Sequence, residues 1–278
     1  MPVQPEIIGD ADLNKAAAVL REGLSTDPAN SELYSDLGQA LSLLRRPAAE
    51  RVQILELYPD KASMPAPLVY SLALALAEAR RFDDAERLFQ GRFFPREEGG
   101  TNVRQVYLEV KLQRALSAAM AGQSAEALRG VAELGKPVAG LDFTRDGFEP
   151  LLADARVQLL IAEIEQKAGQ TAAAEKRRKD MLGRTSSRRR GASPAYVYMA
   201  ARALADPSAD GLRTRMCQFV EVPGGAASNG IALYMRGLAL RECGKPGEAR
   251  QTLDLAIRAA DRNLSQYLAR EALASLPR

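Results

Sequence analysis

Apolar side chains recur at intervals of three and four residues along most of the chain, and short turn sequences interrupt this pattern at regular distances. In the clearest segment, Gly237 and Leu240 precede a turn at 244–247, and Ala249 and Leu253 follow it at helical spacing. This pattern predicts two amphipathic helices packed as a hairpin. The small residues Gly237 and Ala249 would lie where the two helices touch, and the leucines would fill the seam around them.

The same turn recurs along the chain as a turn residue followed five positions later by alanine. Further copies are Gly122 with Ala127, Gly169 with Ala174 and Arg80 with Ala85. Residues 31–59 form the first complete copy, with a turn at 45–47. A period of roughly 34 residues is typical of stacked helical hairpins.

These repeats predict an all-α fold: a right-handed solenoid of about six antiparallel helix hairpins, closed by a C-terminal capping helix. We expect one helical-repeat domain over residues 1–278, with the hairpins over 31–261 and the capping helix over 263–278. Residues 1–30 contain only the second helix of a repeat. We therefore expect the chain to be an excised segment of a longer protein, and an irregular N-terminal cap is the alternative.

Three other parts of the chain depart from the regular repeat. The segments 195–204 and 210–220 predict a degenerate hairpin with weaker signals. The connections 135–149 and 182–193 are longer than the repeat needs, and we expect them to be loops.

Composition narrows the functions that this fold could carry. The chain has no histidine and no tryptophan, and 5% of its residues are aromatic. Without histidine the commonest general base and metal ligand are missing, so we expect a protein that is not an enzyme and has no cofactor. Cys217 and Cys243 lie in predicted helices without a Cys-x-x-Cys arrangement, so we expect buried, inert thiols; a redox or disulfide role is the alternative.

The N-terminal segment and the longest apolar run bear on the location of the protein. Glu6 and Asp10 interrupt the N-terminus, which has no apolar run long enough for a signal peptide. Glu78 and Arg80 soon follow the apolar run at 72–77, so no segment reaches the ~18 uncharged apolar residues of a membrane span. We expect a cytoplasmic protein with no membrane span.

From Ala11 to Leu276, the helical spacing and the turn with its following alanine resemble tetratricopeptide repeats. The resemblance implies a binding scaffold of stacked hairpins. Its partner would be a protein or peptide, or an N-terminal domain of the same protein that this chain lacks.

A second resemblance is narrower. Residues 93–100 read Phe-Phe-Pro-Arg-Glu-Glu-Gly-Gly, and Tyr107 follows. This phrase is similar to one in a bacterial family whose tetratricopeptide tail follows a galactose-mutarotase-like β-sandwich of unknown function. Arg96 replaces the tryptophan of that family, and one acidic residue is added. The resemblance implies an accessory tail of a carbohydrate-associated bacterial protein.

In a tetratricopeptide superhelix, the first helix of each hairpin lines the concave groove. By the repeat register, the groove-facing positions include Gln39, Tyr70, Leu74, Arg156, Glu163, Tyr234 and Arg241. They lack the repeated Lys, Arg and Asn of a carboxylate clamp. This mixed set predicts an extended or helical partner segment held by apolar anchors and a few hydrogen bonds. The alternative is that several of these side chains only pack against neighbouring hairpins.

A basic segment supplies a second functional hypothesis. Between residues 171 and 191, eight basic side chains oppose only two acidic ones. This basic strip comprises Lys176, Arg177, Arg178, Lys179, Arg184, Arg188, Arg189 and Arg190. It could bind an anion such as nucleic acid, an acidic peptide or a lipid head group. No aromatic side chain is interleaved for base stacking, so nucleic acid is the less favoured partner and a solvated charged loop is the alternative.

Other motifs do not reach the requirements of a site. The stretch from Asp142 to Gly147 resembles the opening of a calcium loop, but Ala153 stands at the position of the bidentate glutamate. We expect an interhelical turn there. The Gly-Lys-Pro turns at 135 and 244 lack the upstream glycine of a phosphate loop. No catalytic, cofactor or metal site is predicted.

Overall fold

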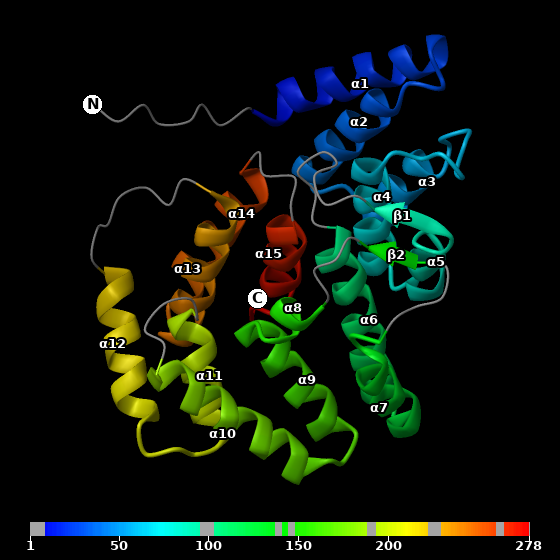
Figure 1. Cartoon of the computed structure of the whole chain (residues 1–278). Coiled ribbons are helices and arrows are strands. Elements are labelled where there is room, and N and C mark those ends of the chain that lie inside the picture. Colours follow the sequence, from blue (N-terminus) through cyan, green and yellow to red (C-terminus); the bar gives the residue numbers. More distant parts are fainter. Residues whose placement is uncertain are drawn as a thin grey trace. The chain divides into compact units, whose positions relative to one another are not determined.

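The computed structural model describes residues 9–94, 103–136, 141–143, 148–187, 193–221, 229–259 and 264–277. Helices make up most of these ranges, which agrees with the predicted helical class (Figure 1). The chain divides into two compact units. Unit 1 comprises Met1–Val110 and Val138–Thr144, and unit 2 comprises Lys111–Pro137 and Arg145–Arg278. No helix in these described ranges is both long enough and apolar enough to cross a membrane.

Unit 1 consists of successive helices and one short β ladder. Its helices are α1 (Asp10–Thr26), α2 (Ser31–Leu43), α3 (Ala48–Leu55), α4 (Ala66–Glu78), α5 (Phe82–Arg87) and the first part of α6 (Val103–Met120). Strand β1 (Arg92–Phe94) pairs in parallel with β2 (Leu141–Phe143). No strand was expected from the sequence, and a loop was expected where β2 lies. A ladder of three residue pairs is too short to leave a period-two pattern in the sequence.

Helix α4 forms the centre of unit 1, where it contacts α2, α3 and α5. It is apolar on all sides, and a helix of this kind is stable in water only when it is covered all round. Its buried side chains include Leu68, Val69, Leu72 and Leu76. An aromatic cluster follows α5, in which the ring of Phe89 lies 5.3 Å from that of Tyr107 and 5.8 Å from that of Phe94.

Unit 2 contains the rest of α6 and the remaining helices. They are α7 (Ser124–Glu133), α8 (Glu149–Leu152), α9 (Ala155–Lys167), α10 (Thr171–Ser187), α11 (Pro194–Ala203), α12 (Ala209–Glu221), α13 (Gly230–Glu242), α14 (Pro246–Arg258) and α15 (Leu264–Ala274). Each of α9, α11 and α13 packs against the helix that follows it, and α9, α11, α13 and α15 also contact one another in this order. Figure 1 shows α13, α14 and α15 side by side.

The five predicted turns are present, and a left-handed residue forms each of them and a sixth turn at Ala205. The positive φ angles are 55° at Arg45, 61° at Arg80, 76° at Gly122, 84° at Gly169, 50° at Ala205 and 77° at Gly244. In each turn, the next N–H bonds a carbonyl five residues back, as from Lys245 N to Leu240 O at 3.0 Å. This is the Schellman arrangement that ends helices.

The small residues of the repeat lie where helices touch, as predicted. Ala85, Ala127, Ala174 and Ala249 have no exposed surface. A Cβ atom on Gly237 would lie 2.7 Å from Leu253, so α13 and α14 approach too closely there for a larger residue.

Helices lie at both ends of the described chain. Helix α1 lies within the N-terminal segment, and α15 lies within residues 263–278 and packs against α13 and α14. The predicted loop at 182–193 is wrong in its first half, because α10 continues to Ser187.

Candidate functional site

The predicted groove positions fall in both units and differ in exposure. In unit 1, Tyr70 and Leu74 are only 4% and 6% exposed, and Gln39 is half-buried. In unit 2, Tyr234 is buried, Arg156 and Arg241 are half-buried, and Glu163 is exposed. These exposures favour the alternative interpretation for Tyr70, Leu74 and Tyr234, namely that they pack inside the protein. Long side chains on these helices reach back onto their neighbours, and register alone does not reveal this.

In unit 2, several of these positions belong to two groups of polar contacts, one around Tyr196 and Tyr234 and one around Glu242. These groups together form the polar row, which crosses α9, α11, α13 and α15 and comprises Arg156, Tyr196, Arg202, Tyr234, Arg241, Glu242 and Ser275. Ser275 directly follows the end of α15. The row therefore follows the four helices that contact one another in sequence.

At one end of the polar row, two tyrosines meet inside the protein. The hydroxyls of Tyr196 on α11 and Tyr234 on α13 are hydrogen-bonded at 3.1 Å. Burial raises the pKa of Tyr196 far above its ordinary value, and the neighbouring Tyr234 raises it further. The charge of Arg156 on α9 opposes this shift. The hydroxyl of Tyr196 thus stays protonated, and its hydrogen bond with Tyr234 links α11 to α13.

At the other end, two guanidinium groups share one buried carboxylate. The side chain of Glu242 is 5% exposed, and its two oxygens accept from Arg202 Nη1 at 2.7 Å and from Arg241 Nε at 3.0 Å. Arg241 also donates from Nη1 to the hydroxyl of Ser275 at 3.3 Å. Both charged partners satisfy the carboxylate, so a buried acid is tolerated here.

Arg202 is the accessible group of the polar row. Its side chain is 58% exposed, and its guanidinium carbon lies 5.5 Å from the centre of the Tyr198 ring. Only one of its N–H groups donates to Glu242. The group therefore offers donors to an incoming acceptor from a fixed position, because an aromatic ring and a carboxylate hold it.

Sequence reasoning missed Tyr196, Arg202 and Glu242. The first two lie on α11, which the sequence analysis assigned to a degenerate hairpin without groove positions. The sequence signal was weak there, because Ala205 takes the left-handed turn position that glycine takes after α9 and α13, and Asp210 stands where four of the other turns have alanine.

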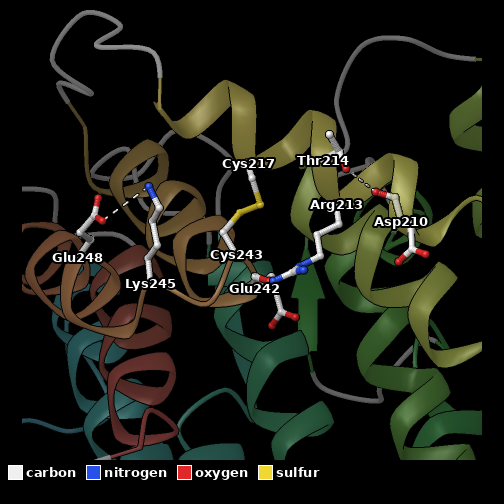
Figure 2. Close-up of a disulfide and its surroundings, with 8 residues drawn as sticks. All are labelled: Asp210, Arg213, Thr214, Cys217, Glu242, Cys243, Lys245 and Glu248. Carbon is white, nitrogen blue, oxygen red and sulfur yellow. Dashed lines mark hydrogen bonds and ion pairs between the residues drawn. A yellow bond between two sulfur atoms is a disulfide. The ribbon is translucent and has the colours of Figure 1, made fainter.

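The two cysteines form a disulfide, which corrects the expectation of free thiols. Figure 2 shows Cys217 on α12 bonded to Cys243, the residue that caps α13. Their Cα atoms are 5.7 Å apart. Beside this bond, Arg213 Nε donates to the backbone carbonyl of Glu242 at 3.3 Å. The separation of 26 residues carries no pairing signal, and the contact depends on how α12 packs against α13.

The basic strip is not uniformly exposed. Arg177 donates to both oxygens of Glu165, at 3.0 and 2.6 Å, and Arg178 is 9% exposed and donates to Gln166. Lys176 and Lys179 are exposed, and each pairs with an acid one turn away on α10. The side chain of Arg184 and the residues Arg188, Arg189 and Arg190 lie outside the described part. Among the described members, only the two lysines face solvent on α10.

Two further motifs are only partly described. In the calcium-like stretch, Asp142 lies in β2, whereas residues 144–147 lie outside the described ranges. In the phrase at 93–100, Phe93 and Phe94 belong to β1, and the rest lies outside them. Within the described residues, no group of three or more Cys, Asp or Glu side chains is placed to hold a metal ion.

The geometry of the polar row thus offers hydrogen-bond donors on a set of packed helices. A comparison with known protein families found none that matches this chain, and a comparison with curated proteins found no match.

Proposed function

We propose that this chain is a non-catalytic interaction scaffold of the tetratricopeptide kind, which binds a segment of a partner protein. In this proposal the helix pairs stack as a right-handed solenoid. The observation that carries the proposal is the polar row, because its members come from four helices that contact one another in sequence. Successive first helices line the binding face of such solenoids.

Arg202 is the proposed anchor for the partner. It is the most exposed charged group of the polar row, and Glu242 and Tyr198 restrict its position. A preorganised guanidinium loses less conformational entropy on binding than a free one, which favours it as a binding hot spot. The partner segment would present a carboxylate or backbone carbonyl to this group.

The experiment is a selection of peptides from a random library on the full chain, followed by affinity measurements. Each selected peptide is titrated against the chain and against Arg202→Gln by calorimetry. We expect the dissociation constant to rise about tenfold in the variant, since a charge-assisted hydrogen bond is lost.

Lys179→Gln is the matched control. It removes one exposed charge in the same unit, from a helix that contributes nothing to the polar row. Its affinity for the selected peptides should equal that of the unchanged chain. Peptides that bind equally well to Arg202→Gln would contradict the proposed binding face.

A further inference from the structure

A pocket of about 460 Å³ lies within unit 1, and none of the residues that line it belongs to the polar row. It is formed by the segment after α3, one side of α4, the region around α5 and the start of β1. Leu72, Leu76 and Leu88 give it an apolar wall, and Leu72 and Leu76 are each only 1% exposed. Its volume falls within the usual range for small-molecule sites.

The charged side chains of this pocket are mostly basic. Lys61, Arg81, Arg87 and Arg92 line it together with two acids, Glu56 and Asp84. The pocket therefore has an excess of positive charge beside its apolar wall.

One arginine, Arg81, forms hydrogen bonds with both acids. Arg81 donates from Nη2 to Glu56 at 2.9 Å and from Nε to Asp84 at 2.5 Å. Hydrogen bonds to Asp84 and then to Glu56 raise its pKa. Arg87 also donates to Asp84, but its side chain is 65% exposed and the rest of its guanidinium is open to solvent. The two carboxylates thus bind Arg81 and Arg87, and the four basic side chains of the pocket exceed its two acids by two charges.

Arg92 is the partly buried member of this set. Its Nη1 donates to the backbone carbonyl of Met64 at 2.8 Å. Burial lowers the pKa of Arg92. The charge of Asp60 acts in the opposite direction but does not cancel this shift. A guanidinium that has lost water without gaining a full counter-charge is stabilised when an anion arrives.

We propose that this pocket binds a small anion attached to an apolar group. The anionic head, a carboxylate or a phosphate ester, would accept from Lys61, Arg87 and Arg92, and the apolar body would lie against the leucine wall. This site lies in unit 1, independent of the peptide-binding face proposed for unit 2.

Calorimetric titration of the full chain tests the proposal with four probes. Phenyl phosphate and hexanoate combine a charge with an apolar body, inorganic phosphate has only the charge, and hexanol has only the body. We expect one of the first two to bind at least tenfold more tightly than inorganic phosphate and hexanol. Preference for phenyl phosphate identifies a phosphate-ester site, and preference for hexanoate identifies a carboxylate site.

A double variant locates the binding. In Lys61→Gln with Arg87→Gln, the affinity of the preferred probe should fall about tenfold or more. The control, Lys15→Gln with Arg21→Gln, removes the same charge from exposed positions on α1, outside the pocket lining, and should leave the affinity unchanged. Asp84→Asn should increase the affinity several-fold, because it removes a competing anion.

Three results would overturn the proposal. The first is that neither phenyl phosphate nor hexanoate binds at millimolar concentration. The second is that inorganic phosphate binds as tightly as phenyl phosphate and hexanoate. The third is that the two double variants weaken binding equally, which would indicate a general effect of net charge.

Discussion

The left-handed residues that end six of the helices differ in what their conformation costs. Glycine adopts a positive φ angle freely, whereas a residue with a Cβ atom loses about 1 kcal/mol there. Gly169 has a φ angle of 84° and Ala205 one of 50°. Ala205 is exposed, so neither burial nor packing offsets its strain.

Substitutions at these turns should therefore change stability in opposite directions. Gly169→Ala should lower the free energy of unfolding by about 1 kcal/mol, although a Cβ atom there would meet no atom within 4 Å. Ala205→Gly should raise it by about the same amount. Urea denaturation of each variant measures both changes.

Gly211→Ala is the control for the conformational argument. Gly211 lies inside α12, and a Cβ atom there also meets nothing within 4 Å, but its φ angle is not positive. The same substitution should stabilise the protein by about 0.5–1 kcal/mol. If Gly169→Ala and Gly211→Ala shifted stability in the same direction, the left-handed turn would not be the cause.

Between elements, the pair of Arg177 and Glu165 joins α10 to α9. Glu165 is 6% exposed, and Arg177 provides two of its hydrogen bonds. Arg177→Ala should lower the free energy of unfolding by about 2 kcal/mol, because a buried carboxylate then loses its counter-charge. Lys176→Ala removes an exposed pair with Asp180 and should cost less than about 0.5 kcal/mol. Equal losses in the two variants would contradict this difference.

The disulfide is the strongest link between α12 and α13. It closes a loop over a separation of 26 residues, which corresponds to about 3 kcal/mol of stabilisation in the chain-entropy account. Replacing both Cys217 and Cys243 by alanine should lower the free energy of unfolding by about this amount. Dithiothreitol should have a similar effect on the unchanged chain and none on the double variant, as urea denaturation would reveal. A stability that dithiothreitol leaves unchanged would contradict the prediction.

This bond also bears on location. Structural disulfides persist in oxidising compartments and are rare in the cytoplasm. The Cys217–Cys243 bond therefore favours an oxidising compartment over the cytoplasmic location expected from the N-terminus.

A feature of the fold could be predicted from the sequence where it depends on residues that are close together along the chain. Helices and turns follow from spacing within a short stretch of chain, so the turn at Gly244 and the position of Gly237 where two helices touch were predicted correctly. The polar row and the disulfide depend on which side chains meet across helices. The sequence therefore indicated Tyr234 as a groove residue, although its hydroxyl lies inside and bonds Tyr196.

At the scale of the whole molecule, the two units carry separate proposals. The pocket lies entirely in unit 1, and the polar row lies entirely in unit 2. Loss of one binding activity should thus leave the other intact, which the Arg202→Gln variant can test by titration with the small anions.

The ionisable composition of the whole chain predicts a simple pH dependence of stability. The chain has no histidine, and both cysteines are in the disulfide, so no side chain has an ordinary pKa between about 5 and 8. The free energy of unfolding should change by less than about 0.5 kcal/mol between pH 6 and pH 7.5. Urea denaturation at a series of pH values measures this plateau.

Below pH 6, the pKa shifts of Asp60 and Asp206 determine the direction in which the free energy of unfolding changes. Hydrogen bonds from Ser63 and from Ser208 lower the pKa of these carboxylates below the value of 3.8 expected in the unfolded chain. Their stabilisation is therefore complete above that value and is lost as the pH falls through it toward the folded pKa. In the double variant Asp60→Asn with Asp206→Asn, the free energy of unfolding should fall less steeply at acid pH. Between pH 6 and pH 7.5 it should stay constant. An acid-induced loss of stability that is equally steep in the double variant would contradict this assignment.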